Sequence, residues 1–198
     1  LLSSGETTGG LQIGIGNEPG DEFVPQAIDW GIITADQDLG AYKAQYLGSL
    51  NGKVLRIDPN TGDGVASNPF FDAAHPRSAQ SRVWAMGFRN PYRMVLRPNT
   101  GSHYPEDGDP GTLIVGDVGN GSWEELNILH TGGQNFGWPV MEGINIAWKF
   151  WTQDVPANPL TPNPLNTCDK PFFDFRDLLA RPKESGPYVP GNPCDLSR

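Results

Sequence analysis

The sequence predicts an all-β fold made of short antiparallel strands and long ordered loops. Apolar residues alternate with polar ones at period two in five short stretches, whereas helical periodicity is scarce. The 25 glycines and 19 prolines exceed a fifth of the 198 residues, which suits a chain with many turns. Because the chain also has 6 tryptophans, 9 phenylalanines and 5 tyrosines, it has the aromatic content that disordered segments lack.

The five predicted strands follow one another along the chain, and turn sequences such as DPNTGDG and GNGS separate them. The N-terminal residues LLSSGE are expected to belong to a strand whose beginning is missing. Residues 36–50 are expected to contain a short helical turn. The predicted strands are GKVLRID (52–58), RVWAMGF (82–88), YRMVLRP (92–98), GTLIVGD (111–117) and WEELNIL (123–129).

The last four predicted strands, residues 82–129, have short links and are expected to form one continuous antiparallel meander. Such a meander is typical of one blade of a β-propeller. At roughly 45 residues per blade, residues 1–143 would supply about three blades. Because a propeller ring needs more than three blades to close, we expect the chain to be part of a ring. The remaining blades would come from the rest of the protein or from another chain.

Residues 144–198 are expected to form a Pro-rich C-terminal tail that packs on the propeller. Their proline run, VPANPLTPNPL, lacks the backbone N–H groups that a regular sheet requires. Both cysteines, Cys168 and Cys194, lie in this tail. In an exported protein we predict that a disulfide joins them, whereas in a cytosolic protein they would be unrelated free thiols.

The net charge of -9 argues against nucleic acid or an anionic membrane surface as a partner, because both require a cationic face. No stretch approaches the roughly 18 to 20 consecutive apolar residues of a membrane-spanning helix. An acidic surface instead suits solubility and the binding of divalent cations.

Three motifs occur in a fixed order: SLNGKVLRIDPNTG, then GFRNPYRM, then GDVGNGSWEELNIL followed by GGQNFGWPVMEG. Together they resemble the glucose/sorbosone dehydrogenase family over about residues 48–143. This family contains soluble quinoprotein sugar dehydrogenases and the non-enzymatic Hedgehog-interacting proteins. The resemblance implies a six-bladed propeller with four-stranded antiparallel blades. In the enzymes, the central cleft binds pyrroloquinoline quinone (PQQ) with Ca²⁺, and the anomeric carbon of an aldose is oxidised to a lactone.

The resemblance places Arg89 and Asn90 at the cofactor, because they match the Arg-Asn pair of the family. PQQ is a tricarboxylate quinone, so its site needs a planar, permanently charged donor and an amide that can also donate. Pro91 restricts Asn90 to extended conformations, which helps to fix the direction of its side chain. The alternative is that Arg89 pairs with an acidic loop while Asn90 caps a turn.

The resemblance also implies a calcium site, because Ca²⁺ prefers oxygen ligands and a Gly-rich turn allows backbone carbonyls to converge. The enzymes usually have Gly-Pro where this chain has Gly119-Asn120, and Gly-Asn is more usual in the Hedgehog-interacting branch. An alternative for Glu125 is that it and Glu124 simply alternate out of a strand. The expected ligands are the backbone carbonyls of Gly119, Asn120 and Phe136 and the side chain of Glu125.

No catalytic residue is predicted within this chain. A sugar dehydrogenase needs a base that takes the hydroxyl proton, and histidine suits this role at neutral pH. The resemblance places that histidine upstream of the segment, and His75, His103 and His130 match no catalytic position. Lys53 lies on a strand that is expected to face away from Arg89, so its replacement is expected to have little effect on cofactor binding.

The preferred interpretation is a fragment of a secreted or periplasmic PQQ- and calcium-dependent sugar dehydrogenase. Its partners would be a small-molecule sugar and an electron acceptor. The alternative is a non-catalytic, calcium-holding binding propeller of the Hedgehog-interacting type, and a weaker one is a structural surface protein. Asn120-Gly121-Ser122 is also an N-glycosylation sequon, and a glycan there would argue against a cofactor.

Overall fold

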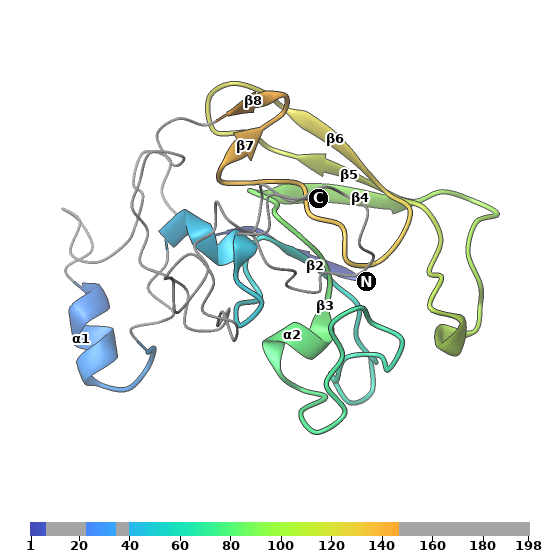
Figure 1. Cartoon of the computed structure of the whole chain (residues 1–198), viewed down its shortest axis with the longest axis horizontal. Helices are drawn as coiled ribbons and strands as arrows, with labels where there is room; N and C mark the ends of the chain where they lie inside the picture. Colours follow the sequence, from blue (N-terminus) through green and yellow to red (C-terminus); the bar gives the residue numbers. More distant parts are fainter. Residues whose placement is uncertain (7–22, 35–39, 147–198) are drawn as a thin grey trace, which may run out of the picture.

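The computed structural model describes residues 1–6, 23–34 and 40–146, and strands dominate them (Figure 1). The strands form two three-stranded sheets, ordered β1-β2-β3 and β4-β5-β6, and the hairpin β7-β8. Every strand pair within these sheets is antiparallel. The strands are β1 (Leu2–Ser4), β2 (Lys53–Leu55), β3 (Val83–Met86), β4 (Pro91–Leu96), β5 (Leu113–Asp117), β6 (Glu125–Leu129), β7 (Met141–Glu142) and β8 (Asn145–Ile146). The helices are α1 (Phe23–Asp29), α2 (Ala79–Arg82) and the 3-10 turns η2 (Gly40–Gln45) and η3 (Pro105–Asp107).

The predicted all-β character is confirmed for the described residues, and each predicted strand has an observed strand within or overlapping it. β5 shows why: its buried and half-buried side chains alternate along LIVGD, as expected for a strand with one face on the core. The turn η2 lies inside residues 36–50, where a helical turn was expected, and β1 lies in LLSSGE.

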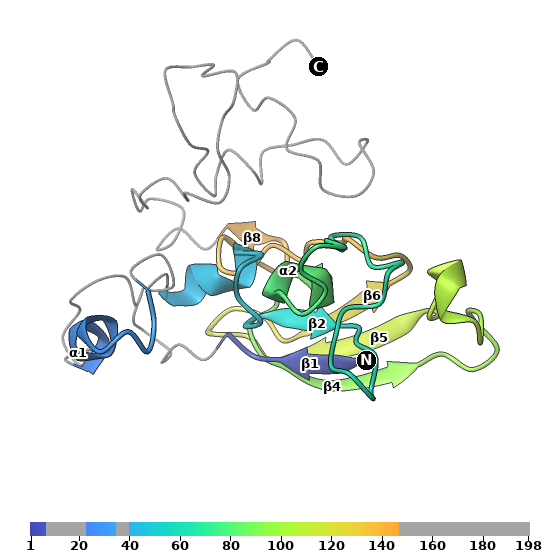
Figure 2. The ribbon, with the colours of Figure 1, turned by 90° about the horizontal axis from the view of Figure 1, so that it is seen from below.

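The core lies between the two three-stranded sheets, which lie against each other in Figure 2. Both sheets contribute fully or almost fully buried side chains to one cluster, which Met94 of β4 and Phe136 flank. Because the cluster joins residues far apart in the sequence, it fixes the two sheets relative to each other. The buried members are Val54, Trp84, Ala85, Phe88, Leu113, Val115 and Leu129.

The single meander predicted across residues 82–129 is wrong. β3 pairs with β2, and β4 begins the second sheet. The chain changes sheet just after β3, where Gly87 adopts a φ of 80°. The N–H of Phe88 still donates to the carbonyl of Gly52, at 3.2 Å, but those of Arg89 and Asn90 donate to the side chain of Asp117. Period-two patterning identifies a strand but does not specify its partner strand.

The chain between β6 and β7 runs parallel to β3 and joins the first sheet by backbone hydrogen bonds. Met86 donates to the carbonyl of Gln134 at 3.0 Å, and Phe136 donates back to the carbonyl of Met86 at 3.0 Å. Trp138 then donates to the carbonyl of Gly87 at 3.0 Å. These bonds place the segment NFGW beside the turn that follows β3.

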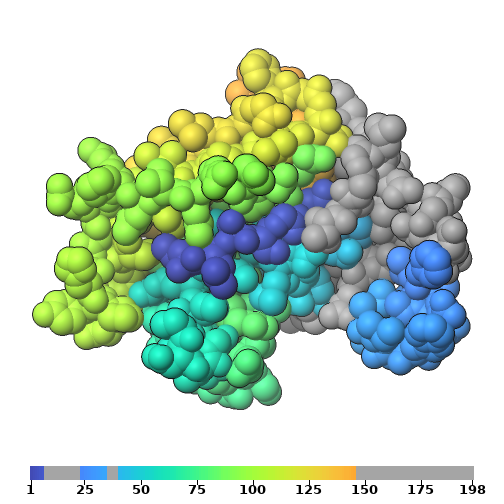
Figure 3. Space-filling view, turned by 180° about the vertical axis from the view of Figure 1, so that it is seen from behind, coloured from blue at the N-terminus to red at the C-terminus, as the bar shows by residue number. Residues whose placement is uncertain are grey.

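The outer face of the β4-β5-β6 sheet carries a row of apolar residues. Val95, Ile114 and Ile128 lie opposite one another across its strands, and we call them the outer row. Val95 is 59% exposed and Ile128 is 45% exposed, and Leu126, in the next row, is 71% exposed. Figure 3 shows the green-to-yellow part of the chain, which contains this sheet, at the molecular surface.

Two sequence-based predictions fall on parts that the structure does not describe. Residues 147–198 contain almost all of the expected Pro-rich tail, and Cys168 and Cys194 lie there, outside the described residues.

Among the helices of the described ranges, none combines the length and the apolar character that crossing a lipid bilayer would require.

Candidate functional site

One buried carboxylate holds the turn between β3 and β4. The backbone N–H of Arg89 donates to Oδ2 of Asp117 at 3.0 Å, and that of Asn90 donates to Oδ1 at 2.6 Å. Asp117 is the last residue of β5 and only 3% exposed. The end of β5 therefore determines where the predicted Arg-Asn pair lies.

Burial raises the pKa of the Asp117 carboxyl from its ordinary value of 3.8 to about 6. The N–H groups of Arg89 and Asn90 oppose this effect because they stabilise the ionised form. The carboxylate of Glu125, which lies opposite Asp117 in the register of β5 and β6, raises the pKa further, whereas the charge of Arg89 lowers it. Asp117 therefore gains or loses its proton in the mildly acidic range.

The guanidinium of Arg89 crosses from this turn to the loop after β5. Its Nη1 donates to the carbonyl oxygens of Val118 at 3.0 Å and Gly119 at 2.8 Å. Its Cζ lies 5.7 Å from the ring centroid of Trp138, within the range of a cation–π contact. Its Nε is buried and has no hydrogen-bond partner within the part of the chain that the structure describes. Arg89 thus bonds to backbone carbonyls of the loop, not to a loop carboxylate as the alternative predicted, and one of its buried donors has no acceptor.

A second carboxylate, that of Glu142 in β7, organises the loop formed by residues 119–122. Its Oε1 accepts the N–H groups of Asn120 at 2.5 Å, Gly121 at 3.0 Å and Ser122 at 3.2 Å. Glu142 is only 6% exposed, and this burial acts to raise its pKa. The backbone N–H donors outweigh burial, so the pKa of Glu142 is lowered overall and the side chain is ionised.

The structure brings some of the predicted metal ligands together and separates others. Gly119 and Glu125 line one small cleft, together with Arg89. Phe136 lines a neighbouring pocket, which it shares with Glu125, and Asn120 lines neither space. Within residues 1–6, 23–34 and 40–146, no three His, Cys, Asp or Glu side chains are grouped to hold a metal ion. The small cleft is lined by Arg89, Asp117, Val118, Gly119, Glu125, Trp138 and Glu142.

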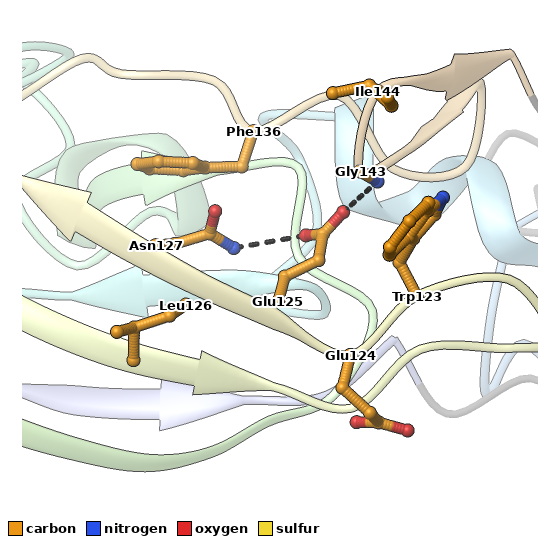
Figure 4. A pocket seen from close by; sticks show the side chains of 8 residues that line it. All are labelled: Trp123, Glu124, Glu125, Leu126, Asn127, Phe136, Gly143 and Ile144. Carbon is orange, nitrogen blue, oxygen red and sulfur yellow. Dashed lines mark hydrogen bonds between the residues drawn. The ribbon is translucent and has the colours of Figure 1, made fainter.

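The neighbouring pocket has a volume of about 330 Å³ and lies beside β6 and the β7-β8 hairpin (Figure 4). Glu125 points into it, accepting hydrogen bonds from Nδ2 of Asn127 at 3.1 Å and from the N–H of Gly143. Glu124 points away, so the two neighbouring carboxylates do alternate. The lining residues are Trp123, Glu124, Glu125, Leu126, Asn127, Phe136, Gly143 and Ile144.

Lys53 has a structural role that the sequence did not predict. It is fully buried, and its Nζ donates to three backbone carbonyls, those of Lys43 at 2.7 Å, Ala44 at 2.9 Å and Asn51 at 2.7 Å. Burial lowers its pKa well below the ordinary value. Replacing Lys53 would therefore disturb the core, which makes it an unsuitable control for ligand binding.

The sequence also gave no reason to select Asp117 or Glu142. The only feature visible in the sequence was that each acidic residue ends a mostly apolar stretch. Asp117 ends LIVGD, and Glu142 ends PVME. None of the three histidines lines the cleft or the pocket. His75 instead contacts the Asp72 carboxylate at 2.8 Å.

Comparison with known proteins identifies similar sequences. The family described as Glucose / Sorbosone dehydrogenase matches residues 31–168, more than half of the chain. The HIPL1 protein of Arabidopsis thaliana is 27% identical over 135 residues, which cover 62% of this chain and 18% of the relative. The HIPL2 protein of the same plant is 30% identical over 115 residues, which cover 50% of this chain and 15% of the relative. The chain thus spans less than a fifth of these relatives, and no solved structure matches it.

Proposed function

Because the chain belongs to the glucose/sorbosone dehydrogenase family, we propose that it forms part of an exported sugar dehydrogenase that uses PQQ and Ca²⁺. In this proposal, residues 1–143 belong to a six-bladed propeller, on which residues 144–198 pack. An aldose is the substrate, its anomeric carbon is oxidised to a lactone, and a separate electron acceptor reoxidises the cofactor. The observation that carries the proposal is the buried Nε of Arg89, for which the described residues supply no hydrogen-bond acceptor.

A carboxylate group fits this orphaned donor. A guanidinium binds carboxylates through parallel N–H groups, and a buried donor without an acceptor is costly. Two bonds from Nη1 to the loop after β5 already fix the direction of Arg89, and the amide side chain of Asn90 follows it in the chain. Arg89 and Asn90 therefore suit one carboxylate of PQQ, which they would bind and orient.

The fit for calcium is less complete. Gly119 and Glu125 both line the small cleft, so two of the expected ligand residues lie close together. The Gly119 carbonyl already accepts a hydrogen bond from Arg89, however, and Phe136 lines the neighbouring pocket. Asn120 lines neither space, so the calcium proposal rests mainly on Gly119 and Glu125. If bound here, PQQ would supply a two-electron acceptor for the sugar, and Ca²⁺ would supply a Lewis acid beside it.

A specific contact favours a second candidate function, the non-catalytic, calcium-holding propeller of the Hedgehog-interacting type. The N–H of Asn120 donates to Glu142 at 2.5 Å, and a proline at this position could not make that bond. The family resemblance implies Gly-Pro here in the enzymes. The Asn120–Glu142 bond is therefore possible in a Gly-Asn loop, as in the Hedgehog-interacting branch, but not in the Gly-Pro loop of the enzymes.

The experiment that separates the two functions is a titration of PQQ into the full-length protein at saturating Ca²⁺, followed by its absorbance. The proposed enzyme binds PQQ and then reduces an electron-accepting dye in the presence of an aldose. A protein that holds Ca²⁺ but binds no PQQ would contradict the enzyme and support the binding propeller. A protein that binds neither PQQ nor Ca²⁺ would contradict both candidate functions.

A further inference from the structure

The proposed function assigns no ligand to the neighbouring pocket, which lies beside β6 and the β7-β8 hairpin. Its volume of about 330 Å³ is at the lower end of the range for small-molecule sites, roughly 300 to 1,000 Å³. The rings of Trp123 and Phe136 line it, and the Glu125 carboxylate lies between them in the view of Figure 4. The pocket therefore combines one carboxylate with two aromatic surfaces.

Both aromatic rings are supported by neighbouring residues. The ring of Phe136 packs against that of Phe88 in the core, with the two centroids 4.9 Å apart. Gly143 lies close to the indole of Trp123, because a Cβ placed on Gly143 would be 2.9 Å from Cδ1 of the ring. The Trp123 side chain is nevertheless 49% exposed, so part of its ring surface is open to a ligand. The electron-rich faces of such rings attract cations.

The Glu125 carboxylate is oriented by hydrogen bonds but has no cationic side chain paired with it. It accepts Nδ2 of Asn127 at 3.1 Å and the N–H of Gly143. Arg89 shares the small cleft with Glu125, but within the described residues no salt bridge joins the two side chains. The guanidinium of Arg89 bonds instead to carbonyls of the loop after β5. A cationic ligand would supply the missing counter-charge in the pocket.

The lining suits an organic cation better than other classes of ligand. An anion would meet a carboxylate, and no Lys, Arg or His is among the described residues that line the pocket. A metal ion such as Ca²⁺ takes about six to eight oxygen ligands, whereas most of this lining is apolar. A sugar needs several hydrogen-bond donors, and the Asn127 amide already donates to Glu125. The net charge of -9 would also attract a cation.

We propose that the neighbouring pocket binds an alkylated ammonium group, which the rings of Trp123 and Phe136 flank and the Glu125 carboxylate neutralises. The alkyl groups of the ligand would bury apolar surface against the rings and against Ile144, which also lines the pocket. The positive charge would interact with the ring faces and with the carboxylate. This binding requires neither PQQ nor Ca²⁺, so the proposal goes beyond the proposed function.

The test is a calorimetric titration of the full-length protein, free of calcium and PQQ, with choline. Its neutral carbon analogue, in which a tert-butyl group replaces the trimethylammonium group, has the same shape without the charge. We expect choline to bind at least about fivefold more tightly than the analogue. Equal affinities would overturn the proposal, as would the absence of choline binding. Glucose is titrated in parallel, and tighter binding of glucose than of choline would also overturn it.

Two variants test the residues that the proposal names. Glu125→Gln keeps the shape of the side chain, and we expect it to lower choline affinity by at least about fivefold while leaving that of the neutral analogue unchanged. Trp123→Leu should lower choline affinity by about two- to fivefold, and Trp123→Phe by less because a ring remains. Wild-type choline affinity in both Glu125→Gln and Trp123→Leu would overturn the proposal.

The matched controls are Glu106→Gln and Trp30→Leu. Both residues are exposed, and neither lines the neighbouring pocket or the small cleft. Their choline affinities should equal that of the wild type, and losses as large as those of Glu125→Gln and Trp123→Leu would contradict a site in this pocket. A short peptide that carries trimethyllysine distinguishes the source of the cation, because tighter binding of the peptide than of choline would place it on a protein partner.

The result is separable from the proposed function. A protein that binds PQQ but not choline would keep the proposed function and lose this site. A protein that binds choline with the expected dependence on Glu125 and Trp123, but does not bind PQQ, would keep this site and contradict the enzyme.

Discussion

Nη1 of Arg89 lies 2.8 Å from the carbonyl oxygen of Gly119, although the two residues are 30 positions apart in the chain. The same two segments are joined in the other direction, because Asp117 accepts the backbone N–H groups of Arg89 and Asn90. The turn after β3 and the loop after β5 therefore form one hydrogen-bonded unit. A substitution in either segment should therefore change the structure of the other segment.

Replacing Arg89 should weaken PQQ binding. Arg89→Ala removes a charge-assisted contact and both Nη1 bonds to the loop, so we expect at least tenfold lower affinity, roughly 2 to 5 kcal/mol if the cofactor contact is buried. Arg93→Ala is the matched control, because the Arg93 guanidinium lies over the exposed ring of Tyr92, 5.0 Å from its centroid. PQQ titration at saturating Ca²⁺ measures both variants, and equal affinities would contradict the prediction.

Gly119 and Gly121 should respond differently to the addition of one methyl group. A Cβ on Gly119 would lie 1.7 Å from the Trp123 carbonyl oxygen, whereas a Cβ on Gly121 would meet nothing within 4 Å. We expect Gly119→Ala to lower the free energy of unfolding by about 1 to 3 kcal/mol, since the backbone must move. Gly121→Ala should change it by less than about 0.5 kcal/mol. Urea denaturation measures the difference, and similar losses in the two variants would show that the loop does not have this packing.

Asp117 should make the stability of the calcium-free protein depend on pH. Its pKa is about 6 in the folded protein, above the ordinary value of 3.8, so between these values the folded state binds more protons than the unfolded state. Stability should therefore fall as pH rises from about 4 to about 6, by up to about 3 kcal/mol from this group. Denaturation of wild type and Asp117→Asn across this range tests the prediction, which requires the variant to lose that part of the slope.

Lys53 should be essential for the stability of the first sheet. Lys53→Met keeps an apolar side chain of similar length but leaves three backbone carbonyls without their donor, so we expect a loss of about 2 to 4 kcal/mol. Lys43→Met serves as the control, because Lys43 is only half-buried and interacts with Lys53 through its backbone carbonyl. Thermal unfolding measures both, and a Lys53→Met variant as stable as Lys43→Met would refute the structural role.

The strands could be predicted from the sequence because their patterning is local. The alternation of buried and half-buried residues along β5 is visible as LIVGD in the sequence alone. The assignment of β3 and β4 to different sheets could not be predicted in this way. It depends on the turn at Gly87 and on hydrogen bonds to Asp117, a residue 27 to 28 positions away from the groups it binds.

The candidate site was only partly predictable, for a related reason. Arg89 and Gly119 were expected near each other through the family resemblance, and the structure joins them by a hydrogen bond, although their binding of a ligand remains a prediction. Asp117 and Glu142 were missed because each carboxylate binds the backbone of a different segment. A carboxylate that binds N–H groups has no sequence signature of its own, since any residue except proline can supply the donor.

The outer row of Val95, Ile114 and Ile128 determines how the described part of the chain should behave when it is handled in isolation. Each square ångström of such apolar surface removed from water contributes about 25 cal/mol, so two molecules gain by pressing these faces together. Strand β6, which carries Ile128, is at the edge of its sheet among the described strands, and this adds a second route to contact between molecules. Concentrated samples of the segment should scatter light increasingly, and arginine or a mild detergent in the buffer should keep them dispersed.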